Sequence, residues 1–414
     1  MRRLRVFSMV VLAAAALAAP DATCAYPLDG YAATGIRRLE RLRLRLAGEL
    51  EGPLPVAGGR KRLSEIQLHA AGAVDRDFPG TDAELQREIE RLFFDRDASY
   101  SLALIEISPA ARFASMRPDK LYSPGSIGKL AIAAGIFAEL ARRFPENRES
   151  RRALLRERMV EAGGWIVHDH HKVPLFNPDT RSVGFRPIRE GDVFSLYEWL
   201  DHMLSASANA AASTVWKEVM LMRAFGAGYP PSPAAEDSFF SATPRVELQK
   251  LSLTVVNDPL RAVGIDEKEW QLGTFFTRAG KNMVPGVRSY ASPRALVRFL
   301  LRIEQGRMVD AWSSLELKRM MYMTERRIRY ASSPALAEAA VYFKSGSLYR
   351  CKKEEDFECG KYRGNVDNYM NSVAIVEKPD GRVYLVALMS NVLRVNSAVE
   401  HQTLATYIDR ILAR

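Results

Sequence analysis

The chain has 414 residues, of which 47% are hydrophobic and 26% charged, and its net charge is +10. This composition excludes a wholly disordered chain and a coiled coil, and the length suits one large domain or two ordinary ones. The positive charge favours weak association with an anionic cell-wall polymer or membrane surface, with a solvated basic surface as the alternative, and no nucleic-acid motif is present.

The first 25 residues have the pattern of a secretory signal peptide. Three arginines precede an apolar stretch at residues 7–19, and small residues at 23–25 offer a cleavage site. The apolar stretch is short for a membrane span, although an uncleaved anchor is the alternative. We therefore expect a periplasmic or secreted protein that loses residues 1–25.

Residues 26–80 are predicted to form an N-terminal extension with an amphipathic helix. Apolar residues of segment 35–50 recur at helical spacing, with arginines on the opposite side, at Ile36, Leu39, Leu42, Leu46 and Leu50. A helix of this kind packs on its own protein more often than on a membrane.

Residues 81–414 are predicted to form the main domain, which begins with a helix at 82–94 capped by Thr81 or Asp82. A β-rich run at 100–107 and a partner at 112–116 follow. After Pro124 and Gly125 the sequence becomes helical and apolar on most sides, which is typical of a helix buried in the interior.

The middle of the chain is less regular. Few elements are clear at 145–190, and inserted loops are expected there and at 226–260. Capped helices are predicted after Ser195 and at 292–305, and a further helix from about Asn209.

The C-terminal part predicts strands at 340–346, 371–377 and 382–390 and a helix at 397–412. The element order predicts an α+β fold, in which N-terminal and C-terminal strands share an antiparallel sheet packed with helices beside an all-helical lobe.

After signal cleavage, two cysteines remain, Cys351 and Cys359, in the charged segment CKKEEDFEC. In an exported protein such a pair predicts a disulfide that closes a loop. The segment from His168 to His171 suggests a metal site, but adjacent ligands cannot all converge on one ion. We expect a polar loop bordering the active cleft, and no metal or other cofactor.

The first chemical motif is Ser126-Ile127-Gly128-Lys129. Residues i and i+3 share a helix face, so the serine hydroxyl and the lysine amine can meet. A buried lysine can be neutral and can activate the serine as a nucleophile. This motif alone is weak, because solvent-facing Ser-x-x-Lys pairs are common.

The second motif is Ser207-Ala208-Asn209, at a helix junction. The hydroxyl could relay a proton to a leaving group, and the amide could orient the substrate and the lysine. By itself the motif has little value, since Ser-x-Asn is common in turns.

The third motif, Lys344-Ser345-Gly346-Ser347, ends a β-run. Its lysine could hold a carboxylate, its glycine permits close approach, and the Ser347 amide could form an oxyanion hole with the Ser126 amide. A solvated lysine before a turn is the alternative for this motif alone.

Together, the three motifs in this order and context resemble class A β-lactamases and penicillin-binding proteins, over roughly residues 80–414. The resemblance implies a β-lactamase/transpeptidase-like fold and a covalent acyl-enzyme. It also implies that Ser126 is the nucleophile and Lys129 the general base. By the same resemblance, Ser207 shuttles a proton and Asn209 positions the substrate, while Lys344 and Ser345 bind the substrate carboxylate.

Two departures from the family pattern concern the chemistry. Ala208 stands where class A enzymes usually have aspartate. For the glutamate that activates water in deacylation, Glu267 and Glu269 are the only candidates, and neither has the expected asparagine companion. Surface carboxylates are the alternative for both, in which case acylation proceeds while release is slow.

The leading hypothesis is an exported serine β-lactamase that acts as a monomer on a β-lactam or a peptidoglycan-derived peptide. The first alternative is a D-alanyl-D-alanine peptidase or another cell-wall amidase or esterase of the same fold. The second is a catalytically silent cell-wall-binding protein.

Overall fold

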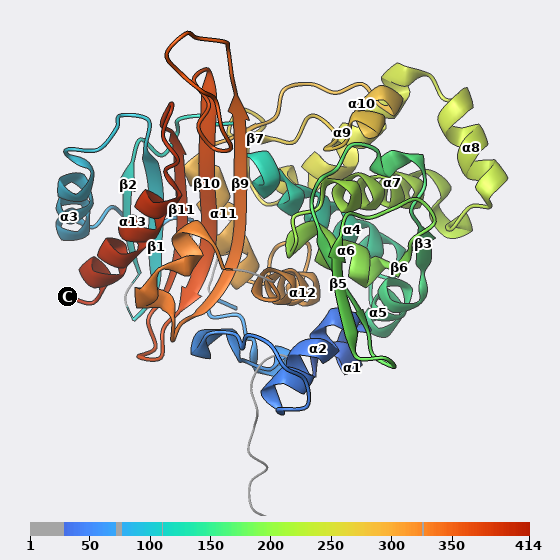
Figure 1. Ribbon diagram of the computed structural model, residues 1–414, viewed down its shortest axis with the longest axis horizontal. Coiled ribbons are helices and arrows are strands. Elements are labelled where there is room, and N and C mark those ends of the chain that lie inside the picture. Colours follow the sequence, from blue (N-terminus) through green and yellow to red (C-terminus); the bar gives the residue numbers. More distant parts are fainter. Residues whose placement is uncertain (1–28, 72–76, 110, 325–326) are drawn as a thin grey trace, which may run out of the picture.

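The computed structural model describes residues 29–71, 77–109, 111–324 and 327–414. The signal peptide expected at 1–25 lies outside these ranges. Within them, the chain forms an antiparallel sheet with helices on both faces and a helical lobe beside it (Figure 1). The α+β fold expected from the sequence is confirmed. In the described part of the chain, no helix combines the length and the apolar character that crossing a bilayer requires.

The central sheet has five strands in the order β2-β1-β11-β10-β9, and each neighbouring pair is antiparallel. Its strands are β1 (Ser101–Ser108), β2 (Arg112–Met116), β9 (Ala340–Arg350), β10 (Asp367–Glu377) and β11 (Val383–Asn391). Strand β1 pairs directly with β11, so strands from the two ends of the domain share one sheet, as the sequence predicts.

Alternate residues of each strand face two separate cores, because successive side chains point to opposite faces of a sheet. Leu102 and Leu104 face the core beneath α3 (Ala83–Phe93) and α13 (Ala398–Leu412). Ala103 and Ile105 face the larger core, which includes α11 (Pro293–Glu304) and α12 (Ala311–Tyr322). The sheet is therefore buried on both faces.

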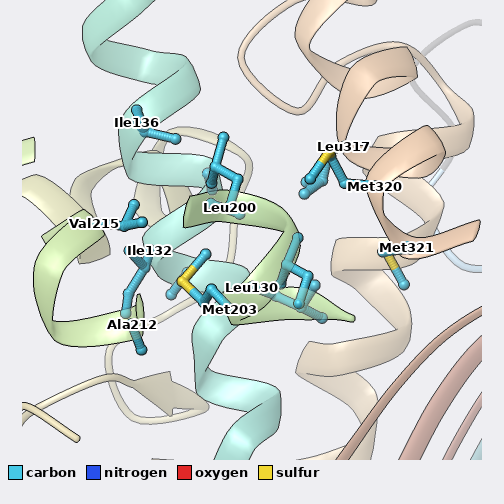
Figure 2. Packing of buried hydrophobic residues seen from close by; sticks show 14 of the residues in the cluster. Leu130, Ile132, Ile136, Leu200, Met203, Ala212, Val215, Leu317, Met320 and Met321 are labelled. Carbon is cyan, nitrogen blue, oxygen red and sulfur yellow. The ribbon is translucent and has the colours of Figure 1, made fainter. Parts of the chain in front are cut away.

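The helical lobe is built around one buried helix. Its helices are α4 (Lys129–Arg143), α5 (Arg148–Glu157), α6 (Leu196–Leu204), α7 (Asn209–Phe225), α8 (Pro233–Ala242), α9 (Arg245–Ala262) and α10 (Arg278–Met283). Figure 2 shows Leu130 and Ile132 of α4 among side chains from α6 and α7. Gly135 lets α9 approach, since a Cβ there would lie 2.6 Å from the Val255 carbonyl oxygen. The interior position expected for this helix is confirmed.

The expected loops at 226–260 are wrong, because α8 and most of α9 occupy that segment. The buried face of α9 is interrupted by Ser252 and Asn257 and ends near Pro259, which hides its helical pattern. Segment 145–190 contains α5 and a hairpin. The minor strands of the described chain are β3 (Met159–Glu161), β4 (Val173–Asn177), β5 (Ser182–Arg186), β6 (Val193–Ser195), β7 (Trp270–Gln271) and β8 (Tyr290–Ala291).

The N-terminal helices α1 (Gly30–Thr34) and α2 (Arg37–Leu46) pack on the helical lobe. The expectation that arginines would fill the opposite side of this helix is wrong for Arg38 and Arg41, which are buried. Arg38 donates to Asp201 of α6 at 2.6 Å, so a counter-charge stabilises the buried cation.

Short 3₁₀ turns complete the described structure. They are η1 (Ala57–Gly59), η2 (Leu63–Glu65), η3 (Gly125–Gly128), η4 (Gly164–Ile166), η5 (Gly226–Gly228), η6 (Arg329–Ser332) and η7 (Pro334–Leu336).

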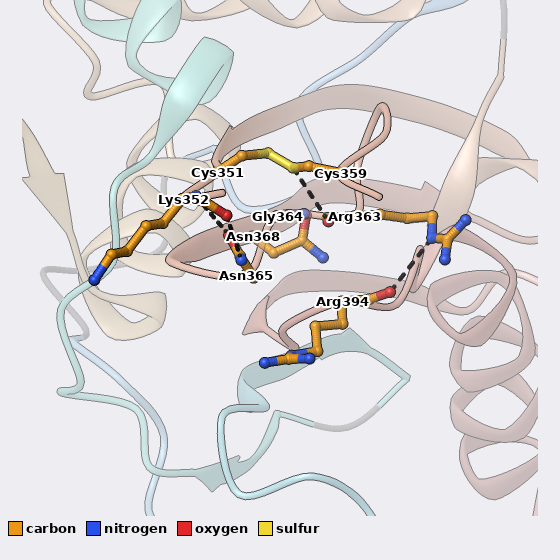
Figure 3. Close-up of a disulfide and its surroundings, with 8 residues drawn as sticks. All are labelled: Cys351, Lys352, Cys359, Arg363, Gly364, Asn365, Asn368 and Arg394. Carbon is orange, nitrogen blue, oxygen red and sulfur yellow. Dashed lines mark hydrogen bonds between the residues drawn. A yellow bond between two sulfur atoms is a disulfide. The ribbon is translucent and has the colours of Figure 1, made fainter. Parts of the chain in front are cut away.

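The connection from β9 to β10 contains the disulfide that the sequence predicts, between Cys351 and Cys359, whose Cα atoms are 6.0 Å apart. Figure 3 shows how this loop is tied down, with Lys352 and Asn365 joined by two hydrogen bonds of 2.8 Å. The loop is therefore a fixed projection of the sheet edge.

Candidate active site

Ser126 lies in the 3₁₀ turn η3, and Lys129 is the first residue of α4. The i and i+3 side chains of a 3₁₀ turn lie one above the other. As a result, Lys129 Nζ is 3.0 Å from Ser126 Oγ. The local sequence permits this turn because Gly125 adopts a φ of +54°, which other residues rarely take.

The Lys129 amine is buried and has two further close oxygen neighbours. It lies 2.6 Å from the Ser207 carbonyl oxygen and 2.8 Å from Asn209 Oδ1. Both of these atoms can only accept, whereas the Ser126 hydroxyl can also donate. A neutral amine would therefore give its two hydrogens to the acceptors and turn its lone pair toward Ser126.

Burial lowers the pKa of Lys129 to about 7, although the negative charge of Asp169 acts in the opposite direction and raises it. The ring of Phe276 also lies close, with its centroid 4.8 Å from Nζ. Near neutral pH, a substantial fraction of Lys129 is thus unprotonated, which is the form that can accept a proton from a hydroxyl.

Ser207 joins the same cluster from the junction between α6 and α7. Its φ of +61° is uncommon for a residue other than glycine. Its Oγ accepts from Lys344 Nζ at 2.9 Å and lies 3.4 Å from Lys129 Nζ. The hydroxyl thereby sits between two amines, a position that suits proton relay.

Lys344 reaches this cluster from β9 and is only 2% exposed. Burial, together with the positive charges of Lys129 and Arg329, holds the pKa of Lys344 well below its ordinary value. An anionic group placed beside Lys344 would relieve this electrostatic strain.

Strand β9 packs directly against the 3₁₀ turn η3, here called the serine turn, because Gly125 and Gly346 leave room for the two backbones to approach. A Cβ on Gly346 would lie 2.0 Å from the Pro124 carbonyl oxygen and 3.1 Å from the Ser126 amide nitrogen. A Cβ on Gly125 would lie 2.7 Å from the Ser347 amide nitrogen. The backbone amides of Ser126 and Ser347 therefore both lie at the close contact between η3 and β9.

Two cavities of about 560 and 550 Å³ flank the cluster and share Lys361 and Tyr362 of the disulfide loop. The first cavity is lined by Ser126, Asn209 and Ser347. The second is lined by Ser207, Lys344 and Ser345. The site residues expected from three distant motifs are thus brought together, with Lys129 and Gly346 buried between them.

The segment 266–290 forms the opposite side of the first cavity. It contributes the apolar side chains of Leu272, Phe275 and Phe276 and the polar side chains of Thr274, Lys281 and Ser289. The candidate deacylating glutamates lie elsewhere: Glu269 pairs with Arg298 at 2.8 Å, and Glu267 is exposed. Among the described residues that line either cavity, none carries a carboxylate.

Arg329 is a component of the site that the sequence did not reveal. It is buried beside β9 and donates to the Gly346 carbonyl oxygen at 2.8 Å. No motif marks it. Lys361 and Tyr362 were also missed, although the two cysteines already indicated that their loop is ordered.

The His168–His171 segment borders the first cavity, as the sequence predicts, since His170 and His171 line it. Its Asp169 accepts from the Ala210 amide at the start of α7, at 2.8 Å. Within the described ranges, no group of three or more His, Cys, Asp or Glu side chains is arranged to hold a metal ion.

Residues 245–411 match the model of the β-lactamase enzyme family. No curated protein sequence matches the chain. Among solved structures, the chain is similar to a class A β-lactamase from Bacteroides cellulosilyticus DSM 14838, with 14% identity, a TM-score of 0.53, and coverage of 80% of this chain and 97% of that one.

Two further structures show the same likeness. The TLA-3 extended-spectrum β-lactamase has 13% identity and a TM-score of 0.54, over 80% of this chain and 98% of that one. The chromosome-encoded β-lactamase of Vibrio parahaemolyticus has 14% identity and a TM-score of 0.50, over the same shares. At these identities the likeness shows the fold, and the family match to the C-terminal part adds to it. The chain therefore has a β-lactamase-like fold, and its residues 245–411 match the β-lactamase enzyme family.

Proposed function

We propose that this protein is an exported hydrolase that forms an acyl-enzyme on Ser126 and hydrolyses β-lactam amides. The observation that carries the proposal is the buried contact of 3.0 Å between Lys129 Nζ and Ser126 Oγ. It supplies a nucleophile and a base whose pKa is lowered to about 7.

In acylation, Lys129 takes the proton of Ser126, and Oγ bonds to the carbonyl carbon of the lactam. The resulting oxyanion accepts hydrogen bonds from the amides of Ser126 and Ser347. As the carbon–nitrogen bond breaks, the Ser207 hydroxyl passes a proton to the leaving nitrogen, because it contacts both amines. Lys344 binds the substrate carboxylate.

The substrate is oriented by two further groups. Asn209, which fixes Lys129 through its Oδ1, offers its amide NH₂ to the substrate. Ser345 lines the second cavity beside Lys344, where a carboxylate would lie. We expect Lys344→Ala to raise the KM for carboxylate-bearing substrates more than it lowers kcat.

Labelling with a fluorescent penicillin tests the proposal. The wild-type protein should become fluorescent in a denaturing gel, and Ser126→Ala should not. A wild-type protein that takes up no label, or a Ser126→Ala variant that takes up as much, would show that Ser126 is not an acylated nucleophile.

A D-alanyl-D-alanine peptidase is the second candidate. It is favoured by the lack of a carboxylate among the described residues that line the two cavities, because slow release is typical of penicillin-inhibited peptidases. Slow hydrolysis of nitrocefin together with release of D-alanine from a peptide would favour this function over the first.

The proposal that the protein is exported is based only on the sequence pattern of residues 1–25. We expect the mature protein to begin at Tyr26, which N-terminal sequencing of protein from the producing cells would reveal. A mature protein that begins at Met1 would contradict cleavage, although it would leave the proposed chemistry intact.

A further inference from the structure

The pair Asp169 and His171 forms a hydrogen-bonded unit at the edge of the site. Asp169 Oδ1 lies 2.6 Å from His171 Nδ1, and its side chain is only 5% exposed. Asp169 Oδ2 accepts from the Ala210 amide at 2.8 Å. Because Ala210 follows Asn209, which contacts Lys129, the pair is anchored directly beside the nucleophile and its base.

The contact with Asp169 determines which ring nitrogen of His171 can act as a base. Burial would raise the pKa of Asp169, but hydrogen bonds from His171 and Ala210 lower it to about 2, so the carboxylate stays ionised. An ionised carboxylate accepts from Nδ1–H, which leaves Nε2 with a free lone pair. The His171 side chain is 40% exposed and lines the same cavity as Ser126.

The rest of this cavity offers little else that could activate water. Its ionisable lining groups, besides His171, are lysines, tyrosines and one other histidine, at Lys281, Lys361, Tyr349, Tyr362 and His170. No described carboxylate lines the cavity, and Glu269 is paired with Arg298. Among these lining groups, His171 alone has a carboxylate partner, Asp169, that orients it.

We propose that His171, oriented by Asp169, is the general base that activates water to release the acyl group from Ser126. This inference depends on the proposed acyl-enzyme. It assigns release to a histidine–aspartate pair on the side of the site next to α7, and it leaves the segment 266–290 without a role in proton transfer.

The step balances without a further reactant. Water gives a proton to His171 Nε2 while its oxygen bonds to the acyl carbonyl carbon. The tetrahedral intermediate then collapses with cleavage of the bond between that carbon and Ser126 Oγ. The imidazolium returns its proton to Oγ, which yields the carboxylic acid product and the free enzyme.

The test separates acylation from release. Full-length wild type and His171→Ala are mixed with a β-lactam, and intact-protein mass spectrometry follows the adduct on a time course. His171→Ala should acquire the adduct at the wild-type rate and lose it about 10²-fold more slowly, or slower still, because a general base contributes that much. His168→Ala, on the same loop but exposed and outside the lining of both cavities, should behave as wild type.

Two additional measurements distinguish a base from a structural residue. Asp169→Asn can still accept from the Ala210 amide, so it should keep acylation and lengthen the adduct lifetime by a smaller factor than His171→Ala. Added imidazole should shorten the lifetime in His171→Ala and not in the wild type. A lifetime in His171→Ala that imidazole leaves unchanged would contradict the role of base.

Failure of this inference differs from failure of the proposed function. A wild-type protein that forms no adduct at all would remove the proposed function. An adduct that forms on Ser126 and decays equally fast in wild type and His171→Ala would overturn only the role of His171. Equal slowing of acylation and release would likewise show that His171 is structural.

Discussion

The two sides of the first cavity differ in the polar groups that they offer for catalysis. On one side, Ser126, Lys129, Ser207 and Lys344 form a continuous cluster of hydrogen bonds between α4, the α6–α7 junction and β9. On the other, the segment 266–290 presents three apolar and three polar side chains, and none of these carries a carboxylate. In the proposed mechanism, forming the acyl-enzyme and releasing it therefore depend on groups that are positioned separately, so one step can be retained when the other is changed.

Apolar residues of segment 266–290 still contribute to the environment of Lys129. The ring of Phe276 lies 4.8 Å from Lys129 Nζ, and a Cβ on Gly128 would lie 2.9 Å from Leu272. These groups exclude water from Lys129, and that exclusion lowers the pKa of its amine. The segment therefore supports the proposed activation of Ser126 without supplying a carboxylate.

Removing the nucleophile should have the largest effect. Ser126→Ala should lower kcat for nitrocefin by about 10⁵-fold or more, since loss of a catalytic serine costs this much in other hydrolases. Steady-state kinetics on protein with an unchanged circular dichroism spectrum would measure it. Residual activity above a few per cent would mean that the cluster containing Ser126 does not carry out catalysis.

Removing the base should have the next largest effect. Lys129→Met keeps the length of the side chain but has no amine, so the acylation rate should fall by about 10²–10⁴-fold. In the wild type, the acylation rate should rise as pH rises through about 7, because Lys129 accepts a proton only when it is unprotonated. Stopped-flow acylation from pH 5 to 9 would show this, and a flat profile would contradict it.

The close approach of β9 to the serine turn can be tested at Gly346. Gly346→Ala would place a methyl group 2.0 Å from the Pro124 carbonyl oxygen and displace the proposed oxyanion donors. The acylation rate should fall by about 10²–10³-fold, as when an oxyanion donor is lost. Gly184→Ala is the matched control, because its Cβ would meet nothing within 4 Å. Similar rates in both variants would show that the contact is not needed.

The disulfide loop connects the two cavities through Lys361 and Tyr362. Replacing Cys351 and Cys359 by serine should lower the free energy of unfolding by about 2 kcal/mol, because the closed loop restricts the unfolded chain. The KM should rise while the acylation rate at saturating substrate changes little. Urea unfolding and steady-state kinetics would measure both, and an unchanged KM would show that the loop does not contact the substrate.

The smallest effect is expected at Glu269, which the sequence offered as a deacylating residue. Its contact with Arg298 is partly exposed, so Glu269→Gln should change stability by no more than about 1 kcal/mol. The lifetime of the acyl-enzyme should stay unchanged. An adduct that persists much longer in Glu269→Gln would return the role of base to segment 266–290.

Much of the fold was predictable because local patterns agreed with the tertiary structure. The strands from both ends of the domain and the helix capped by Ser292 follow from periodicity and capping residues. Helix α9 was missed because its polar Ser252 and Asn257 face inward. Buried Arg38 was misplaced because its partner, Asp201, lies far away in the sequence.

The candidate site divides in the same way. Ser126, Lys129, Ser207 and Lys344 occur in short motifs whose order is informative, so their proximity could be expected before the fold was known. Arg329 and the pairing of Asp169 with His171 depend on tertiary contacts that no local pattern encodes. The roles of these residues remain predictions, as does the division of the chain at residue 80.

The central claim is that Ser126 becomes acylated, and peptide-level mass spectrometry after β-lactam exposure tests it most directly. The predicted result, with a penicillin as the β-lactam, is an added mass equal to the intact penicillin on the peptide that contains Ser126, because opening of the penicillin ring releases no leaving group. Ser126→Ala should show no such mass. An unmodified peptide during active turnover, or the same added mass on another residue, would contradict the account.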